Sequence, residues 1–125
     1  MSGKLLKNIK PNFCFEDERG SLVQLVREGY KQFNVIFSKK GVERGNHFHK
    51  YNTETFYVIK GYVQVRTEKN ADCEVEEYKD GDMFCIEPYI KHSFIYLEDT
   101  WLASMYSEGV ELENGTKDIL SLIHI

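Results

Sequence analysis

Three histidines and one glutamate are the residues of this sequence best suited to chemistry. His47 and His49 are separated by one residue, so in an extended strand both side chains leave the same face. Glu54 follows after a short polar stretch, and His92 comes much later, after a proline. Three imidazole nitrogens and one carboxylate oxygen form a ligand set that suits Zn, Mn, Fe or Ni better than Ca or Mg. The sequence therefore predicts a divalent transition metal bound by His47, His49, Glu54 and His92, and no organic cofactor.

These four residues converge only if the surrounding elements bring distant parts of the chain together. Short runs of β-branched and aromatic residues recur along the chain and are separated by turn residues. Such runs are typical of strands in an all-β sandwich or barrel, where neighbouring strands lie about 4.8 Å apart. The expected strands are 22–26, 33–38, 54–59, 62–67, 73–78, 83–87, 93–97 and 101–107. The only helical candidates are short, at 4–9 and 117–122, and Gly61 and Gly81 are expected to need positive φ in tight turns.

Length and composition restrict the classes of protein to which the chain can belong. Its 125 residues, of which 42% are hydrophobic and 29% charged, predict one globular domain spanning 1–125. A net charge of −4 argues against nucleic acid as a partner. No apolar stretch approaches the length of about 18 residues that a membrane-spanning helix needs. Three widely spaced cysteines favour reduced thiols, and hence a cytoplasmic protein.

The spacing of the candidate ligands resembles the two motifs of the cupin family. Gly41, His47, His49, Glu54 and Gly61 are separated by five, one, four and six residues, as in the first cupin motif. The second motif is similar from Gly81 through Pro88 to His92, although Tyr96 stands where cupins usually have asparagine. The resemblance implies a double-stranded β-helix, the cupin jelly-roll barrel, with at most one or two short helices.

Two further segments resemble a particular group of cupins. Residues 17–20 read Asp-Glu-Arg-Gly, and residues 44–50 read Arg-Gly-Asn-His-Phe-His-Lys. Both are similar to segments of RmlC-like cupins: the dTDP-sugar 3,4-ketoisomerases, dTDP-4-dehydrorhamnose 3,5-epimerase and the cupin domain of capsule-sugar reductases. The resemblance implies a nucleotide-sugar isomerase or epimerase of polysaccharide biosynthesis. Such an enzyme moves a proton next to the ketone of a 4-keto-6-deoxyhexose carried on a nucleoside diphosphate.

The same resemblance implies roles for particular side chains. A histidine of near-neutral pKa is a natural base for this proton transfer, and a phenol can act as a second acid. The arginine fork matches two oxygens of a diphosphate. The candidate catalytic residues are His49 as base or proton shuttle, with His47 beside it, and Tyr57 and Tyr96; the candidate substrate contacts are Arg19, Arg44 and Tyr106. The resemblance also implies a homodimer.

Two alternatives remain open at this point. If a metal occupies the site, His47 and His49 are ligands and cannot be simple bases. The ion would then polarise the ketone, and the base would be another residue such as Tyr57 or Tyr96. Alternatively, the chain is a metal-dependent cupin of another class, such as a small-molecule dioxygenase, or a sugar-binding domain without catalysis.

Overall fold

The computed structural model describes residues 5–121, and this part of the chain folds into strands without any helix. No helix in it is therefore long and apolar enough to cross a membrane. The strands are β1 (Leu6–Ile9), β2 (Phe13–Asp17), β3 (Gly20–Gln24), β4 (Gln32–Ser38), β5 (Glu43–Phe48), β6 (Glu54–Lys60), β7 (Tyr62–Lys69), β8 (Asp72–Lys79), β9 (Met83–Ile86), β10 (Lys91–Tyr96), β11 (Thr100–Tyr106) and β12 (Leu120–Ser121).

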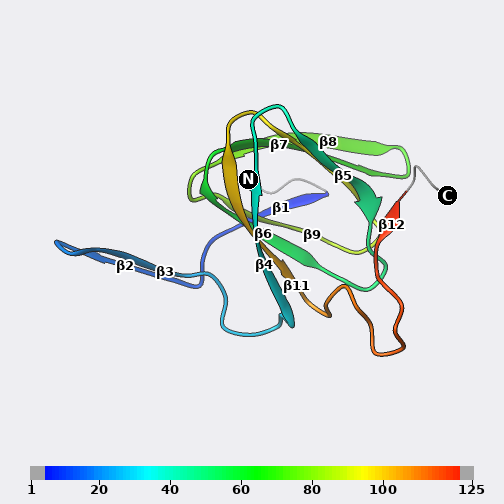
Figure 1. The fold of residues 1–125 in the computed structure, drawn as a ribbon, viewed down its shortest axis with the longest axis horizontal. Helices are drawn as coiled ribbons and strands as arrows, with labels where there is room; N and C mark the ends of the chain where they lie inside the picture. The colour runs from blue at the N-terminus through cyan, green and yellow to red at the C-terminus, as the bar shows by residue number, and fades with distance from the viewer. Residues whose placement is uncertain (1–4, 122–125) are drawn as a thin grey trace.

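Two five-stranded antiparallel sheets form the barrel. One sheet has the order β1-β9-β6-β11-β4 and the other the order β12-β5-β10-β7-β8. The strands β2 and β3 pair only with each other and form a hairpin that projects away from the barrel (Figure 1). The order of the strands places β5, β6 and β10, which carry the candidate ligands, in the walls of one barrel. This is the jelly-roll barrel that the sequence predicts.

Alternating burial along the strands explains why the sequence folds into two facing sheets. In β10 the side chains of His92, Phe94 and Tyr96 are buried, whereas those between them are half-exposed. In β7 the residues Val63, Val65 and Thr67 follow the same rule. Because strand side chains alternate with a period of two, each sheet presents one apolar face to the interior. The two faces meet in a core of aliphatic and aromatic side chains.

Gly61 occupies a turn that only glycine can form. Its φ is +133°, and a Cβ atom at this position would lie 2.3 Å from Thr100 Oγ1 and 2.6 Å from Thr100 Cα. Gly81, with a φ of +86°, also adopts a conformation that side chains disfavour, although the space around it is open. Both expectations of positive φ are therefore confirmed.

The eight strands expected from the sequence all overlap observed strands, but both expected helices are wrong. Within 4–9, the residues Leu6–Ile9 form β1, which pairs with β9. Within 117–122, Lys117 forms an isolated bridge to Glu111, and Leu120–Ser121 forms β12, which pairs with β5. Residues 4 and 122 themselves lie outside the described part of the chain. Isolated helices this short are marginal in water, so pairing with a free sheet edge prevails.

Candidate functional site

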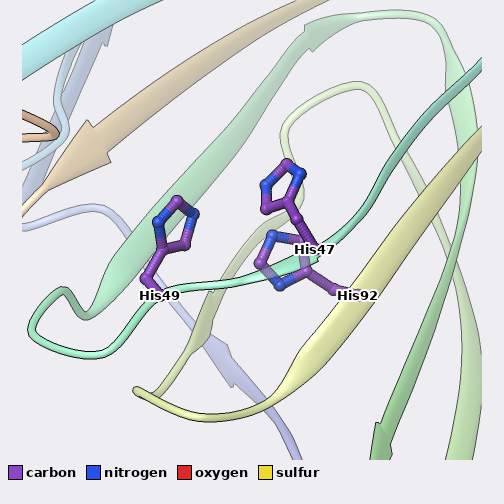
Figure 2. Close-up of side chains that lie close together, drawn as sticks. All are labelled: His47, His49 and His92. Atoms are coloured by element: carbon purple, nitrogen blue, oxygen red, sulfur yellow. The ribbon is translucent and has the colours of Figure 1, made fainter. Parts of the chain in front are cut away.

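The three histidines come from two strands and the loop between β5 and β6, and they converge inside the barrel. His47 in β5 lies directly opposite His92 in β10. His49 follows the end of β5. Each histidine has one ring nitrogen that lies within 4.8 Å of a ring nitrogen of each of the other two. Figure 2 shows the three rings gathered together, and the ring centroids of His47 and His92 are 4.7 Å apart.

A glycine allows the two histidine-bearing strands to approach this closely. Gly45 in β5 has a φ of +99° and lies opposite Ser93 of β10. A Cβ atom on Gly45 would lie 2.9 Å from the main-chain oxygen of His92. A larger residue would therefore push β5 away from β10 and separate His47 from His92. This gives the Arg-Gly pair that precedes the histidines a structural role.

Glu54 lies between two of the histidines and is almost fully buried. Its Oε1 is 3.2 Å from His49 Nε2 and 3.4 Å from His92 Nε2, and its Oε2 accepts a hydrogen bond from Ser104 at 3.0 Å. Burial raises the pKa of the carboxyl group, but the contacts with His49 and His92 outweigh burial and the net pKa is lowered. Glu54 is therefore an anion that the two imidazoles stabilise.

The environments of His47 and His49 shift their pKa values in opposite directions. Burial, together with repulsion from His92 and His49, lowers the pKa of His47 to about 4. Burial also lowers the pKa of His49, but the contact with the Glu54 carboxylate outweighs it, so the net pKa is raised. Near neutral pH, His47 is therefore an uncharged proton acceptor, whereas the Glu54 carboxylate stabilises the protonated form of His49. Such divergence between neighbouring groups is typical of acid–base sites.

A cavity of about 110 Å³ opens beside this cluster. One part of its wall is apolar. Its other part consists of Arg44, Gly45, His47, Glu54, His92, Tyr96 and Tyr106. Arg44 Nε donates a hydrogen bond to Ser38 Oγ at 2.8 Å, which fixes the guanidinium at the cavity. Burial raises the pKa of both tyrosines, so their hydroxyl groups remain protonated and can donate.

Of the four predicted metal ligands, the three histidines bring one ring nitrogen each within 4.8 Å of one another, and Glu54 Oε1 lies near two of them, His49 and His92. Glu54 Oε1 and His49 Nε2 are buried, and neither has a well-directed hydrogen bond within the described residues, although they are near each other. Imidazole nitrogens and a carboxylate oxygen suit a divalent transition metal. The residues present therefore fit the ion that the sequence predicts.

Two predicted site residues lie away from the cluster, and a third, His49, belongs to the cluster but does not line the cavity. His49 is 3% exposed and contacts Glu54. Tyr57 follows Phe56 in β6, and alternation directs it to the opposite face of the sheet. Arg19 lies at the tip of the β2–β3 hairpin, with 80% of its side chain exposed, and forms an ion pair with Asp17 at 2.6 Å. The structure therefore brings Arg44, His47, Tyr96 and Tyr106 to one cavity and does not bring Arg19 or Tyr57 there.

Sequence reasoning missed two buried polar residues beside the histidines. Asn52 and Asp118 are 1% and 3% exposed, and Asp118 contacts the loop that follows His49. In the sequence, both lie in polar stretches that are typical of exposed loops. No local pattern distinguishes them, because their burial results from contacts across more than sixty positions.

Comparison with known proteins agrees with the fold. No curated protein matches the chain. Among solved structures, the WlaRB TDP-quinovose 3,4-ketoisomerase from Campylobacter jejuni is similar at a TM-score of 0.81 and 16% identity, covering 97% of this chain and 95% of that one. A QdtA 3,4-ketoisomerase variant from Thermoanaerobacterium thermosaccharolyticum, in complex with TDP-4-keto-6-deoxyglucose, has a TM-score of 0.79 and 21% identity, with coverages of 97% and 90%.

A dTDP-4-dehydrorhamnose 3,5-epimerase from Sulfolobus tokodaii is similar at a TM-score of 0.69 and 24% identity, with coverages of 83% and 70%. These likenesses confirm the RmlC-like cupin barrel. The family model described as the polysaccharide biosynthesis C-terminal domain matches residues 15–105, which is most of the chain. The chain therefore belongs to the polysaccharide biosynthesis C-terminal domain family and has an RmlC-like cupin fold.

Proposed function

We propose that this protein is a nucleotide-sugar isomerase or epimerase that transfers a proton next to the ketone of a 4-keto-6-deoxyhexose. One observation carries the proposal: a proton acceptor, two phenols and a guanidinium line a single cavity. Proton abstraction beside a carbonyl needs a base for the carbon-bound proton and donors for the oxygen that becomes negative. The solved relatives named as 3,4-ketoisomerases and 3,5-epimerases act on sugars of this class and support the assignment.

We assign roles to the polar side chains that line the cavity and to those beside it. His47 is uncharged near neutral pH and accepts the proton from the carbon beside the ketone. The hydroxyl groups of Tyr96 and Tyr106 donate to the keto oxygen and stabilise the enediolate. Arg44 binds the diphosphate or a sugar hydroxyl group through its fork. His49 and Glu54, whose Nε2 and Oε1 atoms are 3.2 Å apart, determine the charge of the site next to His47.

The size of the cavity limits how much of the substrate enters it. A volume of about 110 Å³ is smaller than the roughly 300–1,000 Å³ of a pocket that encloses a whole drug-sized ligand. We infer that the reacting edge of the sugar enters, while the nucleoside diphosphate lies at the mouth of the barrel. Arg44 is then the residue of the cavity best suited to meet the first phosphate.

A metal ion would change the roles of the same residues. His47, His49, Glu54 and His92 would hold the ion, as the sequence predicts. The ion would supply Lewis-acid polarisation of the ketone. The base would then be Tyr96 or Tyr106, which line the same cavity, and its hydroxyl group would first have to lose its proton against the burial that raises its pKa. Both arrangements produce the same overall isomerisation and differ in the residue that removes the proton.

We further propose that the protein is a homodimer. Large apolar side chains are exposed on the outer face of the β4–β11 sheet, with Val35 at 56% and Trp101 at 47%. The projecting β2–β3 hairpin also exposes Phe13 and Phe15. Contiguous apolar surface of this kind marks interaction sites on soluble proteins. Because the hairpin carries Arg19 away from its own barrel, Arg19 can bind substrate only at the site of a neighbouring subunit (Figure 1).

An NMR exchange experiment tests the proposed reaction. The protein is incubated in D₂O with dTDP- and UDP-linked 4-keto-6-deoxyglucose, and deuterium is followed at C3 and C5. We expect exchange with at least one substrate, and its loss in His47→Asn. Tight binding of the sugar nucleotides without exchange would instead favour the non-catalytic sugar-binding alternative, and absence of both would overturn the proposal.

Metal analysis separates the remaining possibilities. Elemental analysis of the purified protein, followed by EDTA treatment and re-addition of Zn, Mn, Fe or Ni, shows whether exchange depends on an ion. Loss on chelation and recovery with metal would assign the ligand role to the histidines. Full activity of a metal-free sample would assign His47 as the base. Oxygen uptake with candidate small molecules would support the dioxygenase alternative.

A further inference from the structure

We propose that Asp118 is a positioning residue for His49. Its carboxylate binds the loop that follows His49, and its main-chain carbonyl binds the imidazole ring of His49. The catalytic consequence rests on the proposed function of the same site. Asp118 is 3% exposed and lies just before β12, far from His49 in sequence. It contacts neither the cavity nor Glu54 in the described structure, so its effect on the reaction passes through His49.

The carboxylate of Asp118 accepts hydrogen bonds from three consecutive main-chain N–H groups. Lys50 N donates to Oδ1 at 2.7 Å, and Tyr51 N and Asn52 N donate to Oδ2 at 3.0 and 3.1 Å. These residues follow His49 directly, in the turn that leads the chain from β5 to β6. An ionised carboxylate only accepts hydrogen bonds, so it matches a row of donors. Without it, all three N–H groups would lose this acceptor, and the cost would be largest at Asn52, which is buried, whereas Lys50 and Tyr51 are exposed.

Asn52 joins this turn to the segment 107–118. Its Nδ2 donates to Asp118 Oδ2 at 2.7 Å and to Gly109 O at 2.9 Å. Its Oδ1 accepts from Glu108 N at 2.8 Å and from Gly109 N at 3.0 Å. The amide of Asn52 therefore uses both donors and both acceptor positions inside the protein. The turn and the segment 107–118 form one connected unit that holds Asp118 in place.

The main chain of the same residue contacts the histidine ring. His49 Nδ1 forms a short hydrogen bond with the carbonyl oxygen of Asp118. A carbonyl oxygen only accepts, so Nδ1 must carry the proton. Nε2 is then the nitrogen directed at Glu54 Oε1, 3.2 Å away. The same ring orientation serves both possible roles of Nε2, which can carry a proton toward Glu54 or hold a metal ion. In the second case the contact is the usual one, because histidine ligands typically donate their second N–H to a carbonyl or carboxylate.

The two contacts depend on each other through a single residue. The carbonyl of Asp118 can meet His49 only while its main chain is held beside the turn. The carboxylate supplies the hold on the side of the turn, through Lys50, Tyr51 and Asn52, and Asp118 N, which donates to Val110 O at 2.7 Å, supplies a second hold on the other side. Removing the carboxylate should therefore release the ring, although the side chain itself does not touch the imidazole. A purely local change then alters the orientation of His49.

The test compares Asp118→Ala and Asp118→Asn with Glu113→Gln, an exposed acid in the same segment. In ¹⁵N-histidine NMR spectra, the wild type should give one His49 signal with Nδ1 protonated. Asp118→Ala should shift or broaden that signal and lower kcat for the exchange reaction about 10- to 100-fold, with KM little changed. Asp118→Asn keeps one acceptor oxygen, so its His49 signal and its kcat should lie between those of Asp118→Ala and the wild type. Glu113→Gln should match the wild type in both measurements.

One result would overturn the proposal: an unchanged His49 signal in both Asp118 variants, whether or not kcat falls. If Asp118→Ala does not fold, the signal of Asp118→Asn decides. The NMR measurement needs no substrate, so it remains decisive if the wild type shows no isomerase activity, which would overturn only the proposed function.

Discussion

Replacing Glu54 by Gln removes one buried negative charge while keeping the shape of the side chain. In the structure the Glu54 side chain is 5% exposed and contacts His49 and His92 through Oε1. Its other oxygen accepts from Ser104 Oγ at 3.0 Å. Gln can keep the Ser104 contact through its carbonyl oxygen. The substitution therefore removes the interaction between the carboxylate and the two imidazoles, and it also weakens the contact of Glu54 with the Tyr106 hydroxyl group.

The expected loss follows from the burial of both partners. A hydrogen bond to a charged group contributes about 1.5–3 kcal/mol, and breaking a buried ion pair costs about 3–5 kcal/mol. His49 can release its proton when its partner is gone, which limits the loss. We expect the free energy of unfolding to fall by roughly 2–4 kcal/mol. For a domain of 125 residues this corresponds to a decrease in Tm of roughly 8–16 °C.

Chemical denaturation at pH 7 measures this loss, with Glu87→Gln as the matched control. Glu87 pairs with Lys7 at 3.0 Å, but their side chains are 42% and 50% exposed. A surface pair contributes about 0–1 kcal/mol, so this variant should remain close to the wild type. If Glu54→Gln and Glu87→Gln lose equal stability, the carboxylate of Glu54 does not act as the buried counter-charge. The inference that this carboxylate stabilises the protonated form of His49 would then be wrong.

Three further predictions concern the base, a turn and the outer face. His47→Asn should slow deuterium exchange about 10²- to 10⁴-fold while dTDP binding persists, and an unchanged rate would exclude His47 as the base. In a urea titration, the free energy of unfolding should fall by about 2 kcal/mol more in Gly61→Ala than in Gly81→Ala. Only the Cβ atom at position 61 would collide with a neighbour, at 2.3 Å from Thr100 Oγ1, so equal losses would contradict the contact. Trp101→Asp should convert a dimer into a monomer in light-scattering chromatography, whereas an unchanged mass would argue against this face.

The fold was largely predictable because its main signal is local. Runs such as 62–67 and 93–97 alternate apolar and polar residues, and the strands β7 and β10 include most or all of them. The segments at 6–9 and 120–121 carry no such pattern and were expected to be helical. Their strand conformation comes from pairing with β9 and β5, which are far away in the sequence. Edge strands of this kind depend on the partner more than on their own residues.

For the site, the sequence by itself determined the chemistry: which side chains can bind a proton or a metal, and which face of a strand His47 occupies. Tertiary structure decided which of these groups share a cavity. It brought Arg44 and Tyr96 beside His47, and it left Tyr57 on the outer side of its sheet. It also buried Asp118 against the turn after His49. The reason is physical: residue type and period are properties of neighbouring positions, whereas burial and contact depend on pairing between segments that the chain connects only through long loops.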